Sequence, residues 1–271
     1  MNALALAIAC LVPTAGAADE YDNPLLRELL SDGVTIGGTA IQLPPPTLTD
    51  KLDADEQRAA LDKITDANHT LDKLLGRSVN APFVLKRSAE ATKDAEQTAQ
   101  RVDLWFFVHA ELEEVASQDF VRRWSDLAGG KESSDDLPVR SGELSPQEIA
   151  ERKLKAEADS GEHYLYSTIN LLDRVRVSAT RRAVVSRSDG SLLVAARVDS
   201  RFDDDPEYPN QWQPLVRNEA GKLSAQEPRP YPGAAFYVKV TKLAEPAGTL
   251  LIEHHQVFTE PQGWFRGAKL L

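Results

Sequence analysis

The first candidates for chemistry are acidic and imidazole side chains near the C-terminus. Glu253, His254 and His255 are adjacent in an apolar run, and a strand places Glu253 and His255 on one face and His254 on the other. With His109 or His163, these residues would supply imidazoles and a carboxylate, a donor set suited to zinc or iron. Adjacent histidines cannot easily share one ion, so the pattern favours the alternative, a core His254 and a surface His255.

Arginine is concentrated in the middle of the chain, although 31 Lys and Arg against 42 Asp and Glu give a net charge of −11. The arginines of this region are Arg174, Arg176, Arg181, Arg182, Arg187, Arg197 and Arg201. A two-residue turn at Asp189-Gly190 predicts a hairpin in which Arg182 lies opposite Arg197. Two like charges side by side are unfavourable without a bridging anion or carboxylate. We therefore expect either an anionic ligand there or ion pairs with the acidic segments 111–114 and 148–157.

Aromatic residues suggest a second way of holding a ligand. Tyr208 and Trp212 follow the arginine-rich hairpin, and aromatic faces beside polar groups can hold a sugar or a peptide. The alternative, which the pattern favours, is that they close the open end of a sheet.

The acidic run Asp203-Asp204-Asp205 has enough carboxylates for calcium. It lacks the alternation of Asp and Gly seen in known calcium loops. The hairpin register also offers Arg176 as a partner for Asp203, so we expect a charge-paired loop.

The sequence has none of the common catalytic signatures. It has no G-x-S-x-G, no H-E-x-x-H, no Walker A loop and no G-x-G-x-x-G. His109-Ala-Glu111 matches half of a zinc deaminase motif, but the required P-C-x-x-C segment is missing. The sequence therefore predicts no cofactor and favours a non-catalytic protein.

Residues 1–17 resemble a secretory signal, with an apolar run from Ala3 to Val12 and a small-x-small pattern at residues 15–17. No Lys or Arg precedes the run. The alternatives are lipid attachment at Cys10 and a buried N-terminal element. Cleavage after Ala17 removes Cys10, the one cysteine, and excludes cysteine chemistry from the mature chain. We expect export to the periplasm, the cell envelope or the outside.

Helical patterns dominate the N-terminal half. Pro24 suits the first turn of a helix over 23–30, and the following stretch, 33–49, has the composition of an extended connector. An acidic cap at Asp53 begins a helix predicted to run through Leu74. Further predictions are a strand over 102–108, a helix over 120–127, an exposed loop over 131–142 and a capped helix over 145–159.

After His163 the periodicity changes from 3.6 to 2, which predicts an antiparallel meander. Two further hairpins are expected, one joining 211–217 to 222–225 and one joining 235–243 to 249–258. A sheet covered on one face by helices places the chain in the α+β class. We expect a signal (1–17), an N-terminal extension (18–49) and one domain (50–271), with a split near residue 142 as the alternative.

These patterns together favour an exported, non-catalytic module that binds a partner protein or a small ligand through its sheet, at Arg182, Arg197, Tyr208 and Trp212. One alternative is a hydrolase that uses His, Asp and Glu, with or without a metal. Another is a self-associating structural protein of the envelope. The acidic charge argues against nucleic acid as a partner, and the sequence predicts no transmembrane segment.

Overall fold

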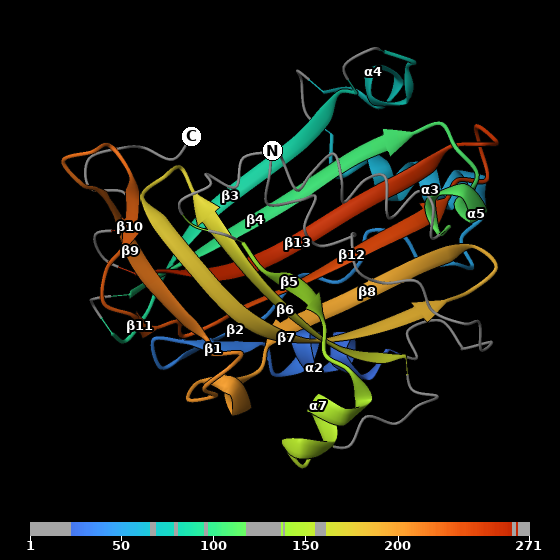
Figure 1. Ribbon diagram of the computed structural model, residues 1–271. Coiled ribbons are helices and arrows are strands. Elements are labelled where there is room, and N and C mark those ends of the chain that lie inside the picture. The colour runs from blue at the N-terminus through green and yellow to red at the C-terminus, as the bar shows by residue number, and fades with distance from the viewer. Residues whose placement is uncertain are drawn as a thin grey trace.

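The structure is a computed structural model that describes residues 23–65, 69–78, 81–94, 97–117, 137, 139–154, 161–261 and 264. One curved antiparallel sheet of eleven strands dominates it (Figure 1), which confirms the α+β class. Its strands are β3 (Phe83–Ala91), β4 (Gln97–Val108), β5 (Ser141–Glu143), β6 (Glu162–Leu171), β7 (Val175–Arg187), β8 (Ser191–Val198), β9 (Gln211–Arg217), β10 (Leu223–Ala225), β11 (Arg229–Pro230), β12 (Ala234–Lys242) and β13 (Leu250–Pro261).

The predicted hairpins are confirmed. β7 and β8 flank the Asp189-Gly190 turn, and Arg182 lies opposite Arg197 as expected. The β9–β10 and β12–β13 pairs follow the predicted segments. The strand predicted over 102–108 is the C-terminal part of β4.

The long hairpin ends earlier than the sequence pattern predicts. A hairpin continued in the same register would place Val177 opposite Phe202. β8 instead stops at Val198, and Val177 pairs with Trp212 of β9. Arg176 likewise lies opposite Gln213 and not opposite Asp203. The cause is local: a short 3₁₀ helix, η1 (Ser200–Phe202), has Asp199 as its cap and turns the chain out of the sheet.

The helices are short and capped largely as the sequence predicts. They are α2 (Pro24–Ser31), α3 (Ala54–Asp62), α4 (Leu71–Leu75), α5 (Leu112–Val115) and α7 (Pro146–Glu151). Asn23 caps α2, and capping boxes begin α3 at Asp53 and α7 at Ser145. None of the helices in the described ranges is long and apolar enough to cross a membrane.

Four predicted segments need correction. The single helix expected from Asp53 through Leu74 is two helices, although Leu61, Ile64 and Leu74 still pack in one cluster. The expected connector contains a hairpin of β1 (Val34–Ile36) and β2 (Thr39–Ile41). The helix expected over 145–159 ends at Glu151, where Arg152 is its C-cap and Lys153 has a positive φ of 57°. Ser141 and Gly142, expected in the exposed loop over 131–142, belong to β5. The predicted signal peptide, the helix over 120–127, and residues 131–136 and 155–159 lie outside the described residues.

The sheet has an apolar cluster on each face. Val194 and Ala196 of β8 face one cluster with α5, while Leu193 and Ala195 face the other with α2 and β1–β2. The segment 44–50 crosses the second face. Its Thr47 amide donates to Glu253 at 2.8 Å, and Asp50 pairs with the buried Lys239 at 2.9 Å.

The sheet divides at Thr180. The same edge of β7 pairs with β9 over residues 175–178 and with β8 over residues 181–187, so Thr180 lies where the two partners diverge. The side chain of Asn210 fills the gap. It accepts from the Thr180 amide at 2.8 Å and donates to the Asp199 carbonyl at 2.7 Å. The Asp199 amide in turn donates to the Thr180 carbonyl at 3.0 Å.

Replacing Asn210 should therefore destabilise the sheet at this division. Asn210 is 1% exposed, and Asn210→Ala leaves a buried amide and a buried carbonyl without partners. We expect a loss of about 2–4 kcal/mol in the free energy of unfolding, measured by urea denaturation.

Asn218→Ala is the matched control, because Asn218 is exposed and its side chain accepts only from amides of its own turn among the contacts described. It should cost no more than about 1 kcal/mol. Equal losses for the two variants would show that Asn210 has no special role.

Candidate functional site

A polar cleft of about 580 Å³ lies beside the division of the sheet. Its lining residues come from the loop after α7, from β6, β7 and β8, and from η1 with its cap. They are Lys153, Glu162, Tyr164, Arg182, Arg197, Asp199, Ser200 and Arg201. Among the described lining residues, four cationic side chains against two carboxylates leave an excess of two positive charges, although the whole chain carries −11.

Strand register builds one wall of this cleft. Tyr164, Arg182 and Arg197 lie directly opposite one another on three successive strands, so their side chains share one face. Glu28 of α2 bridges the two arginines, at 3.6 Å from Arg182 and 3.2 Å from Arg197. Glu162 approaches Arg182 at 3.3 Å. Arg182 and Arg197 are thus compensated by carboxylates outside the two predicted acidic segments, whereas Arg187 of the same hairpin pairs with Glu113 of the predicted segment 111–114, at 3.8 Å.

Arg201 of η1 forms a second wall, beside Tyr164. Its Nε donates to Asp199 at 2.9 Å, and its Nη2 donates to the Tyr164 hydroxyl at 2.8 Å. The hydrogen bond to Asp199 raises the pKa of Arg201 further above its ordinary value. Burial, together with donation to Glu162, raises the pKa of Tyr164 to about 12. Tyr164 therefore remains a neutral donor and acceptor that ties the two walls together.

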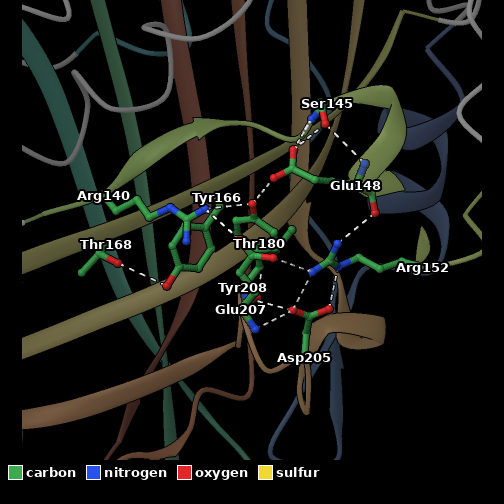
Figure 2. Close-up of polar contacts among 10 residues, drawn as sticks. All are labelled: Arg140, Ser145, Glu148, Arg152, Tyr166, Thr168, Thr180, Asp205, Glu207 and Tyr208. Carbon is green, nitrogen blue, oxygen red and sulfur yellow. Dashed lines mark hydrogen bonds and ion pairs between the residues drawn. The ribbon is translucent and has the colours of Figure 1, made fainter. Parts of the chain in front are cut away.

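A second polar network supports the loop after η1 (Figure 2). Glu148 of α7 accepts hydrogen bonds from Tyr208 and from Ser145, which lower its pKa to about 2. The guanidiniums of Arg140 and Arg152 lie 4.5 and 4.7 Å from the centre of the Tyr208 ring. The aromatic surface of Tyr208 is thus already occupied by cations.

The acidic loop is charge-paired, as expected, but its partners are different residues. Arg152 binds Asp205 at 2.6 Å, and Asn210 donates to Asp203 at 2.7 Å. Arg176, the partner predicted from the hairpin register, lies in the sheet opposite Gln213.

The structure brings together only part of the predicted ligand set. Arg182 and Arg197 line the cleft, whereas Tyr208 and Trp212 are buried in separate clusters. Trp212 packs against Trp264 and lies under Arg229. Sequence reasoning missed Lys153 and Tyr164, because neither residue belongs to a motif and both reach the cleft only through pairing of distant elements.

The predicted metal ligands are also divided. His255 is buried, not on the surface, and lies 2.7 Å from Asp103 and 3.3 Å from Glu253. His109 contacts Thr249 at the end of β4, while His163 pairs with Glu143 at 2.6 Å on β6, four strands from β13. Within the described residues, no group of three or more His, Cys, Asp or Glu is arranged to hold a metal ion.

The two adjacent histidines have opposite electrostatic environments. Burial disfavours a charged His255, but hydrogen bonds to Asp103 and Glu253 outweigh it and raise its pKa. His254 faces the other side of the sheet beside Phe236, and burial lowers its pKa to about 3. Arg101, 3.3 Å from Asp103, completes the charged group around His255.

Comparison with family models and with curated proteins gives no relative from which a function can be transferred. No family model matches the chain, and no curated protein matches it.

The two histidines should affect the free energy of unfolding in different pH ranges. Because the pKa of His255 is raised, its charged form stabilises the folded state, and this contribution is fully present below pH 6.5. The contribution is lost as pH rises through the folded-state pKa. The lowered pKa of His254 favours folding above pH 6.5, and this contribution is lost as pH falls towards 3. Each contribution changes by at most about 1.4 kcal/mol per pH unit.

Urea denaturation between pH 4 and about 9 tests this assignment. His255→Gln should reduce the pH dependence of the unfolding free energy between neutral and alkaline pH. His254→Leu should reduce it at acidic pH. If His254→Leu instead reduced the pH dependence at alkaline pH, the raised and the lowered pKa would be assigned to the wrong histidines.

Proposed function

We propose that this protein is an exported, non-catalytic binding module whose ligand is a small anion bearing carboxylate or phosphate groups. The observation that carries the proposal is the convergence of Arg182, Arg197, Arg201 and Lys153 on one open cleft in an acidic chain. Export is supported by the signal-like residues 1–17 alone.

Geometry supports an anion over a neutral ligand. Each guanidinium has five N–H donors in a planar fork, and a carboxylate or phosphate group can accept two of them at once. Glu28 already places a carboxylate between Arg182 and Arg197, where a ligand group of the same chemistry would be accepted. Arg197 and Arg201 also remain 38% and 49% exposed, so their guanidiniums can be reached from solvent.

The cleft also has the size for a small molecule. Its volume of about 580 Å³ lies within the range of ordinary ligand sites, roughly 300–1,000 Å³. Glu162, Tyr164 and Ser200 add acceptors and hydroxyl groups beside the cations. These groups favour a ligand that carries hydroxyl or amino groups together with its anionic group.

The hydrolase alternative draws no support from the site. The part of the cleft lining that the structure describes contains no histidine, and His109, His163 and His255 lie on separate parts of the sheet.

Inorganic phosphate and citrate are suitable probes, with chloride at equal ionic strength as the reference. We expect both to raise the melting temperature of the wild-type protein in a concentration-dependent way. Arg197→Ala should weaken binding about tenfold, measured by calorimetric titration, because one charged donor set is lost. Glu28→Gln should strengthen binding, since a competing carboxylate is neutralised.

Arg217→Ala is the matched control, because it removes the same charge from an exposed residue that pairs with Asp173. It should leave the affinity for phosphate unchanged. Equal weakening by Arg197→Ala and Arg217→Ala, or equal stabilisation by chloride, would refute the proposed function.

A further inference from the structure

β3 is the longest exposed outer strand in the described part of the sheet. It pairs with β4, and no other described strand adjoins it. Seven of its nine residues are exposed, whereas the outer strands β5 and β10 have three residues each and the outer strand β11 has two. A long open edge presents backbone N–H and C=O groups that can pair with another strand.

This edge also carries exposed apolar side chains. Phe83 is 51% exposed and Leu85 is 41% exposed, and the two project to the same face because they are two residues apart. On the other face, Lys86 lies over Trp105, and Glu90 accepts a hydrogen bond from Ser88. A partner strand at this edge would therefore meet the apolar Phe83 and Leu85, with Arg87 beside them, on one face and opposite charges on the other.

We propose that a second copy of this chain pairs with β3 in an antiparallel dimer whose two-fold axis passes through Ser88. Pairing of the two edges would join both sheets into one continuous sheet, with equivalent faces on the same side.

The charges along β3 select this register. Around a two-fold axis through Lys86 or Arg87, that residue would face its own copy, and two like charges would lie directly opposite. An axis through Ser88 places Lys86 opposite Glu90 of the second copy, and symmetry forms this pair twice. The same register sets Leu85 opposite Ala91 of the second copy.

The interface is small, so the dimer should be weak. A strand of nine residues buries much less than the roughly 1,600 Å² of a standard stable interface. We therefore expect a reversible, concentration-dependent equilibrium. Binding at the anion cleft involves other residues and does not depend on it.

Cysteine cross-linking tests the register directly. In a Cys10→Ser background, Ser88→Cys places two thiols opposite each other, with Cα atoms about 4.5–5.5 Å apart, which suits a disulfide. Ala89→Cys is the matched control, because Ala89 faces Arg87 of the second copy and its own copy lies more than about 7 Å away. Mild oxidation should produce a covalent dimer from Ser88→Cys and little from Ala89→Cys.

Charge exchange tests the interaction in solution. By analytical ultracentrifugation, Lys86→Glu should raise the dimer dissociation constant about tenfold, because two opposite-charge pairs become two like-charge pairs. Adding Glu90→Lys should restore the wild-type value. Circular dichroism verifies that each variant is folded. A wild-type monomer at all concentrations up to the millimolar range, an unchanged constant for Lys86→Glu, or equal cross-linking of the two cysteines overturns the proposal.

Discussion

The division of the sheet at Thr180 is the constraint on which the rest of the site depends. β7 shares one edge between β8 and β9, so a backbone amide and carbonyl are left between two diverging partners. Burial makes such groups costly without hydrogen bonds. Asn210 and Asp199 supply those bonds, and Asp199 also caps the turn that carries Arg201. The interactions that complete the sheet therefore also position one wall of the cleft.

The cleft arginines and two buried charged groups on one face of the sheet are paired with carboxylates, but they differ in their exposure to solvent. Arg182, Arg197 and Arg201 are near one another, yet each has a carboxylate within 3.6 Å that offsets the repulsion. On the same face of the sheet, Lys239 with Asp50, and His255 with Asp103 and Glu253, are buried as compensated groups. The difference is access to solvent: the arginine groups open on a cleft, whereas the histidine group is enclosed. We therefore propose that the first group binds the ligand and that the second stabilises the fold.

Local sequence signals predicted much of this architecture. The Asp189-Gly190 turn set the pairing of Arg182 with Arg197, and the caps at Asp53 and Ser145 marked helix starts correctly. β3 gave no such signal, because an outer strand with one fully buried residue has no alternating pattern. The ion pairs of Glu28 could not be predicted from the sequence either, since α2 contacts β7 and β8 only in the folded chain. Long-range packing explains both omissions.

Selective observation of arginine side chains would test most directly whether the divided sheet forms an anion site. Phosphate can be titrated at constant ionic strength while the Nε–H resonances of the arginines are followed by NMR. Saturable shifts of Arg182, Arg197 and Arg201 with one common dissociation constant, and no shift of the exposed Arg58, are the predicted result. Uniform, non-saturating shifts of all arginines would contradict it.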